Sequence, residues 1–141
     1  MKRQQGFTLL EIMVVVVIMG MLSAIVATNV MGSKEQASIE KASMDIKALD
    51  NALDMYKLDN HRFPTTEQGL DALVNKPTSS PEPKSYRKDG YIKDLPQDPW
   101  GNDYMYINPG THNSSRYDLY SLGPDGEDGT DDDIGNWKKD K

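Results

Sequence analysis

The sequence contains no cysteine, and no proline precedes Pro64. The first absence excludes disulfide bonds, cysteine nucleophiles and thiolate metal sites. The second permits an uninterrupted helix through residues 1–63, because proline breaks helices. A basic patch is also lacking: 16 Lys and Arg stand against 22 Asp and Glu, giving a net charge of −6. Such an acidic chain repels nucleic-acid phosphates, so a nucleic-acid partner is not expected.

The chain joins two kinds of sequence at Phe63. The eight prolines and most of the aromatic residues follow this position. The first part therefore favours a long helix, whereas the second favours turns and strands. The length is that of a single domain, and we expect an α+β fold.

The N-terminal segment has no charged residue between Ile12 and Val30, and it follows the basic pair Lys2-Arg3. At about 1.5 Å per residue this run matches the ~30 Å hydrocarbon core of a bilayer. We therefore predict a membrane helix at 7–31 with its start in the cytoplasm. The alternative is a secretory signal peptide cleaved near Ala27.

Glu11 lies inside the apolar run. A charge deep in a membrane helix costs roughly 2.5–3.5 kcal/mol on insertion scales, so such a residue points to a function. At the headgroup edge the cost would fade, and position alone leaves both interpretations open.

The segment Gly6-Phe7-Thr8-Leu9-Leu10-Glu11 resembles the processing motif of type IV pilins and type II secretion pseudopilins. The resemblance implies that a prepilin peptidase removes residues 1–6 as a leader, cutting after Gly6, and methylates the new amine of Phe7. In an apolar environment that amine needs a counter-charge, which Glu11 of one subunit can offer to Phe7 of a neighbour. Glu11 is thus expected to act in assembly.

A stripe of apolar residues continues the helical pattern, with steps of three and four residues that place its members on one face. The stripe consists of Ile39, Ala42, Ile46, Leu49, Leu53 and Tyr56. We expect one helix from Phe7 to Asp59, ending at Asn60 before Pro64, with Gly20 as its weak point.

The second half is predicted to be a short helix and a small antiparallel sheet packed on the long helix. Thr65 and Gln68 have the spacing of a capping box for the short helix, whose apolar side is Leu70, Leu73 and Val74. Strands are expected around 104–107 and 117–122, with turn residues at 108–110.

Residues 118–133 contain seven carboxylates and neither Lys nor Arg. The carboxylates are Asp118, Asp125, Glu127, Asp128, Asp131, Asp132 and Asp133. Glycines at 123, 126 and 129 would let the backbone fold around a cation. All-oxygen ligands in an irregular loop suit calcium better than magnesium. The spacing is not that of an EF-hand. From the residues alone, a solvated acidic loop and a calcium site both stay open.

Three further segments, 98–102, 121–126 and 132–137, resemble the major pseudopilins of type II secretion, within the type IV pilin-like superfamily. The resemblance implies a periplasmic globular part at 32–141 with one Ca²⁺ in its last loop. Carried onto this sequence, the ligands are the side chains of Asp125, Asp132 and Asp133. The backbone carbonyls of Leu122, Glu127 and Thr130 complete the set. Calcium would replace the C-terminal disulfide of type IV pilins.

The function implied is structural and not enzymatic. The subunit would stay in inner-membrane lipid as a single-pass protein, then polymerise with itself into a periplasmic pseudopilus that drives protein export across the outer membrane. Minor pseudopilins, the prepilin peptidase and an inner-membrane assembly platform would be its partners. The alternatives are a type IV pilus subunit and a membrane-anchored periplasmic calcium-dependent hydrolase, which would need paired carboxylates for acid–base work.

Overall fold

The structure, a computed structural model, describes residues 7–138, apart from the side chains of residues 24–31. Its elements are the helix α1 (Leu9–Asn60), the 3₁₀ helix η1 (Leu70–Leu73) and the strands β1 (Met105–Ile107), β2 (Asp118–Ser121) and β3 (Ile134–Gly135). The chain divides into two compact units, 1–37 and 38–141, whose boundary falls within α1. The predicted continuous helix and α+β fold are confirmed.

The first unit consists of the N-terminal part of α1. Thr8 caps it, since the Thr8 hydroxyl accepts a hydrogen bond from the backbone N–H of Glu11 at 3.3 Å. The large apolar side chains from Phe7 to Leu22 are all exposed, Val15 least at 45%. They therefore have no apolar cover within the described chain. Gly20 lies in unbroken helix, and a Cβ added there would meet nothing within 4 Å.

No helix among the described residues is both long enough and apolar enough to cross a membrane. The predicted membrane helix at 7–31 includes residues 24–31, whose side chains lie outside that description.

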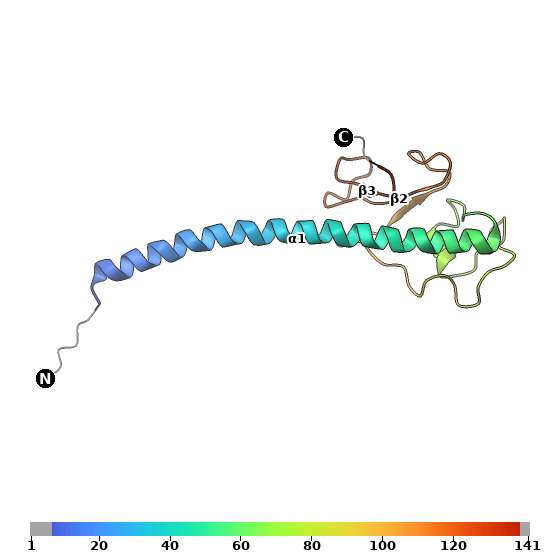
Figure 1. Ribbon diagram of the computed structural model, residues 1–141. Helices are drawn as coiled ribbons and strands as arrows, with labels where there is room; N and C mark the ends of the chain where they lie inside the picture. The colour runs from blue at the N-terminus through green and yellow to red at the C-terminus, as the bar shows by residue number, and fades with distance from the viewer. Residues whose placement is uncertain (1–6, 139–141) are drawn as a thin grey trace. The chain divides into compact units, whose positions relative to one another are not determined.

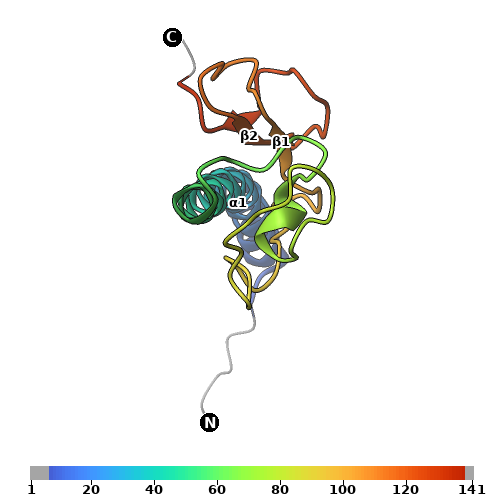
Figure 2. The same ribbon diagram turned by 90° about the vertical axis from the view of Figure 1, so that its right-hand side faces the viewer.

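The second unit is built on the predicted apolar stripe of α1. Ala42, Ile46, Leu49, Leu53 and Tyr56 are all at most 4% exposed. From Ile46 onward they belong to a core that also contains Leu70 and Leu73 of η1 and four residues of the sheet or next to it: Tyr104, Tyr106, Tyr117 and Leu119. The views in Figures 1 and 2 show the sheet and the η1 segment against different sides of the C-terminal half of α1. Burial of each large side chain contributes roughly 1.5–3 kcal/mol.

Polar contacts fix the sheet on α1 at the edge of this core. The Tyr117 hydroxyl donates to the Asp50 carboxylate, and the Tyr104 hydroxyl donates to Asp45 at 2.8 Å. Arg116 pairs with Asp54 at 2.6 Å. Burial, then the hydrogen bonds to these carboxylates, raise the pKa of Tyr117 and of Tyr104 far above the ordinary value, so both remain donors.

The end of α1 is closed by Asn60, as expected. Its side-chain amide donates to the Tyr56 carbonyl at 3.1 Å, and its side-chain oxygen accepts the N–H of Ser85 at 3.0 Å. The chain turns at His61, which has a positive φ of 61°.

The predicted capping box is confirmed, but the helix that follows is shorter than the pattern suggested. The Gln68 N–H donates to the Thr65 hydroxyl at 3.2 Å, and the Thr65 N–H donates to the Gln68 side-chain oxygen at 3.1 Å. A turn separates this pair from η1, which begins at Leu70 and forms a single short 3₁₀ element.

The sheet has the order β1-β2-β3 with both pairings antiparallel. The two predicted strand regions correspond to β1 and β2. The third strand, β3, was not predicted, because two residues are too few to show an alternating pattern. Its pairing of Ile134 with Ser121 brings both ends of the acidic loop together.

Candidate metal centre

The acidic loop 122–133 connects β2 to β3, so the sheet fixes both of its ends. Gly123, its second residue, has a positive φ of 67°. A Cβ at Gly123 would lie 2.5 Å from the Asp132 carbonyl oxygen and 2.9 Å from its carboxylate. Only glycine allows so close an approach in this conformation, and it brings the start and the end of the loop into contact.

A turn at 98–102 is connected to the start of the loop by hydrogen bonds. Asp98 is buried, and its Oδ1 accepts the backbone N–H groups of Trp100 and Asn102 at 3.0 and 2.8 Å. Its Oδ2 accepts the Ser121 hydroxyl at 2.6 Å, and the Ser121 Oγ in turn accepts the Gly123 N–H at 3.1 Å. Asp98 and Ser121 are positioning residues that the sequence analysis did not single out. An Asp followed by Pro, with Gly three residues on, was the available signal, since this pattern is typical of turns.

Asp132 is the centre of the hydrogen bonding within the loop. The Thr130 hydroxyl donates to its Oδ1, and the Asp125 N–H donates to its Oδ2 at 3.1 Å. The bond from Thr130 is the first reason that the pKa of Asp132 lies below its ordinary value, and it outweighs partial burial. Asp132 is therefore held as a carboxylate close to Asp125.

Asp133 is 5% exposed, and one of its two carboxylate oxygens has no partner. Its Oδ2 accepts the Gly129 N–H at 2.9 Å. Its Oδ1 is buried and has no hydrogen-bond partner in the described part of the chain. An unpaired buried charge is costly, so this oxygen fits a cation ligand.

The three residues predicted to bind through their backbone carbonyls, Leu122, Glu127 and Thr130, differ in exposure and in hydrogen bonding. The Glu127 carbonyl accepts the Thr130 hydroxyl at 3.3 Å, while the Glu127 side chain is exposed. Leu122 and Thr130 are half-buried. Across residues 7–138, no three or more His, Cys, Asp or Glu side chains are grouped closely enough to hold a metal. The structure thus brings Asp125 and Asp132 together, and leaves Asp133 apart with a free oxygen.

Two other acidic residues of the segment 118–133 have structural partners. Asp118 accepts the backbone N–H groups of Thr111 and His112 at 2.7 Å each and of Asn113 at 2.8 Å. Burial alone would raise its pKa, but these donors prevail and lower it. Asp128 accepts the Tyr120 hydroxyl at 2.9 Å. Asp118 therefore closes the turn before β2, in keeping with its omission from the predicted ligands.

The N-terminal site is described only from Phe7 onward. Gly6, the residue before the predicted cleavage, lies outside the described residues. Phe7 is 79% exposed, and Glu11 is exposed in the first turn of α1. Glu11 thus lies on the surface of an apolar helix segment.

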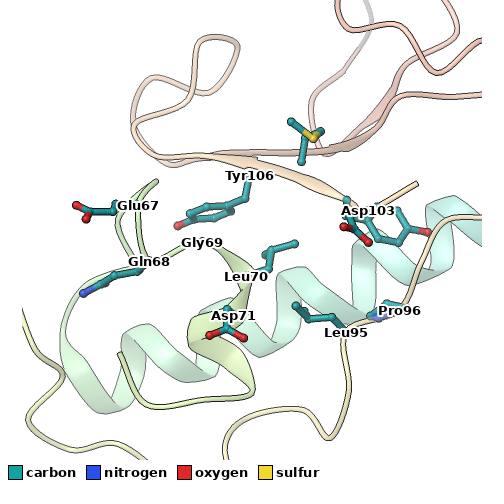
Figure 3. Close-up of a pocket in the computed structure, with 11 residues that line it drawn as sticks. Glu67, Gln68, Gly69, Leu70, Asp71, Leu95, Pro96, Asp103 and Tyr106 are labelled. Atoms are coloured by element: carbon teal, nitrogen blue, oxygen red, sulfur yellow. The ribbon is translucent and has the colours of Figure 1, made fainter. Parts of the chain in front are cut away.

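A hollow of about 420 Å³ lies beside β1, away from the acidic loop. Figure 3 shows Tyr106 and Leu70 in it, with Glu67, Asp71 and Asp103 around it. Its lining holds no Ser, His, Cys or Lys. It therefore contains no Ser–His or Cys–His pair of the kind used in acyl transfer.

Comparison with known proteins agrees with this architecture. Residues 29–137 match the family model for the type II secretion system protein G, and residues 1–27 match the prokaryotic N-terminal methylation motif. The type II secretion system core protein G of Aeromonas hydrophila is 66% identical over 136 residues, covering 96% of this chain and 94% of that protein. The protein of the same name from Pectobacterium carotovorum is 63% identical over 139 residues, covering 99% of this chain and 88% of that protein.

A solved structure matches as well. The major pseudopilin from the type 2 secretion system of enterohaemorrhagic Escherichia coli is 59% identical and superposes with a TM-score of 0.70, covering 77% of this chain and 94% of that one. With the long helix, the small antiparallel sheet and the N-terminal motif, these matches show that the chain belongs to the type II secretion system protein G family, the major pseudopilins.

Proposed function

We propose that this pseudopilin polymerises with itself into a periplasmic pseudopilus, and that growth of the filament drives protein export across the outer membrane. The observation that carries the proposal is the apolar surface from Phe7 to Leu22, at and before the start of α1, where every large apolar side chain is exposed. So large an apolar surface needs cover. Inner-membrane lipid would supply it before assembly, and the helices of neighbouring subunits afterwards.

The N-terminal motif supports a defined route into the filament. A prepilin peptidase would cut after Gly6 and methylate Phe7. The new amine would then pair with Glu11 of a neighbouring subunit. A buried pair of this kind selects one register more than it adds stability, so the Glu11 carboxylate would position each incoming subunit. Minor pseudopilins and an inner-membrane assembly platform would be its partners in this assembly.

A calcium ion in loop 122–133 would brace the part of the subunit that faces outward. The side chains of Asp125, Asp132 and Asp133 and the carbonyls of Leu122, Glu127 and Thr130 would hold it. The unpartnered Oδ1 of Asp133 and the adjacent Asp125 and Asp132 support this assignment. When bound, the ion supplies positive charge that neutralises the loop and joins its two ends. Structural work of this kind breaks no bond, in keeping with a non-enzymatic subunit.

The intact mass of the protein recovered from its native membrane tests the route. Loss of residues 1–6 and gain of one methyl group is the expected result. Cleavage near Ala27 would instead remove the apolar helix, and the filament proposal with it. Glu11→Gln keeps the size of the side chain and removes its charge, so the variant should be cleaved but should not form filaments that sediment. Glu35→Gln, at an exposed glutamate of the same helix, is the matched control and should assemble normally.

A further inference from the structure

Aspartate followed by glycine occurs three times in the chain, at Asp89-Gly90, Asp125-Gly126 and Asp128-Gly129. This dipeptide is prone to a spontaneous rearrangement, because glycine has no side chain to hinder attack by its own nitrogen on the neighbouring carboxyl group. The reaction requires that nitrogen to be free. The three sites therefore differ in what the folded structure does with the glycine N–H.

Two of the three glycine N–H groups are occupied. The Gly90 N–H donates to the Arg87 carbonyl at 3.0 Å. The Gly129 N–H donates to the Asp133 carboxylate at 2.9 Å. Either bond must break before the nitrogen can react, which slows the reaction by roughly fivefold at the usual net strength of such a bond.

The Gly126 N–H has no hydrogen-bond acceptor among residues 7–138. Asp125 and Gly126 are both exposed, so water reaches the peptide bond between them. The Asp125 Oδ1 accepts the N–H of Glu127, two residues on, at 2.8 Å. That bond spans the Gly126 peptide and holds the Asp125 carboxyl group next to it.

We propose that Asp125-Gly126 is a site of isoaspartate formation, and that it rearranges ahead of the other two Asp-Gly pairs. The Gly126 nitrogen bonds to Cγ of Asp125 in its acid form, and the hydroxyl leaves with the Gly126 amide hydrogen as water. The product is a five-membered cyclic imide. Water then opens the imide at either carbonyl, which returns Asp125 or gives isoaspartate with the backbone running through the former side chain. No atom is gained or lost overall.

The modification would act on the acidic loop. Isoaspartate lengthens the backbone by one carbon and replaces the side-chain carboxylate with one attached directly to Cα. The carboxyl group that accepts the Glu127 N–H would become part of the backbone, so this hydrogen bond would be lost. If calcium binds through Asp125, which rests on the proposed function, the bound ion keeps the carboxylate oxygens in place and slows the reaction. Calcium would then slow isoaspartate formation in the loop.

The test is prolonged incubation of the full chain in detergent at neutral pH and 37 °C, with calcium or with chelator. Tryptic peptides are then analysed by electron-transfer fragmentation, which distinguishes isoaspartate from aspartate and locates it. In chelator, isoaspartate should accumulate at Asp125 roughly fivefold faster than at Asp89 or Asp128. Equal rates at the three sites, a higher rate at Asp128, or no isoaspartate at Asp125 while a synthetic 117–138 peptide rearranges would overturn the proposal.

Two glycine variants form a matched pair. Gly126→Ala adds a side chain that hinders attack, and its Cβ would meet only the Asn102 amide at 3.6 Å. Gly129→Ala carries the same strain of a positive φ and also has room for the Cβ. Isoaspartate at residue 125 should disappear in the first variant and persist in the second. Equal rates with and without calcium would count against calcium binding through Asp125, while leaving the site of rearrangement established.

Discussion

Calcium removal is expected to lower the melting temperature of the unit 38–141 and leave its fold unchanged. All seven tyrosines and both tryptophans lie in this unit, so near-ultraviolet circular dichroism of the full chain in detergent reports its unfolding alone. Heating should be compared in excess calcium and in chelator. The shift arises because the ion binds the folded loop and not the unfolded chain.

The size of the shift follows from linkage and from the energetics of the loop. A free calcium concentration about 100 times the dissociation constant stabilises the folded state by about 2.7 kcal/mol. For a unit of this size that corresponds to a rise in melting temperature of about 10 °C. Part of this stabilisation arises because the ion would supply a partner for the Asp133 Oδ1, which is buried without one in the described chain.

Substitutions at the loop separate the ion's effect from packing. Asp125→Ala and Asp132→Ala should not respond to calcium, and should melt at or below the wild type in chelator because each also loses hydrogen bonds within the loop. Asp133→Asn should also lose the shift, but in chelator it should melt at or above the wild type, because it removes an unpaired buried charge. Asp118→Asn is the control: it replaces one of the two acceptor oxygens with an NH2 group, so the three backbone N–H groups cannot all be accepted and the variant should melt lower in both conditions, with the calcium shift intact. The reasoning would be refuted if calcium left the wild-type melting temperature unchanged, or if it raised the melting temperature of Asp133→Asn as much as that of the wild type.

Three further predictions concern the core and its polar edge. Leu53→Ala, at a fully buried position of α1, should cost about 2–5 kcal/mol in urea unfolding, whereas exposed Leu58→Ala should cost little; similar costs would mean that the stripe is not the core. Tyr117→Phe removes the hydroxyl that donates to Asp50 and should cost about 1 kcal/mol in the same assay, and no loss would show that this bond adds nothing to stability. Because the pKa of Asp118 is lowered on folding, its contribution is present above the unfolded pKa near 4 and is lost as the pH falls through the lower folded value. Acid titration of stability should therefore fall less steeply below about pH 4 in Asp118→Asn than in the wild type, and parallel curves would contradict the assignment.

Residue patterns within a short stretch of sequence were enough to predict the structure where the pattern repeats along the chain. The absence of proline and the three-and-four spacing from Ile39 to Tyr56 predicted a continuous helix and its buried face, and both are confirmed. The Thr65–Gln68 pair was predicted for the same reason, since its two partners lie three residues apart. The family followed from short motifs at both ends of the chain, and the comparisons confirm it.

Contacts between distant segments could not be predicted in this way. Nothing in the sequence near Asp98 indicates that its carboxylate accepts the hydroxyl of Ser121, 23 residues away. The two-residue strand β3 exists because β2 is already in place to pair with it. The roles of the carboxylates also depended on folding: Asp118 has its oxygens filled by N–H donors, while Asp133 keeps one oxygen free.

The sequence by itself therefore determined the long helix, its apolar face, the α+β class and the family, because each depends on periodicity or on residues adjacent in the chain. The tertiary structure decided which acids of the segment 118–133 are structural and which remain available to a cation. It also decided which Asp-Gly nitrogen is left free. The physical reason is that a hydrogen bond to a carboxylate or an amide depends on where the partner lies in space, and carboxylates of the same type differ only after the chain has folded around them.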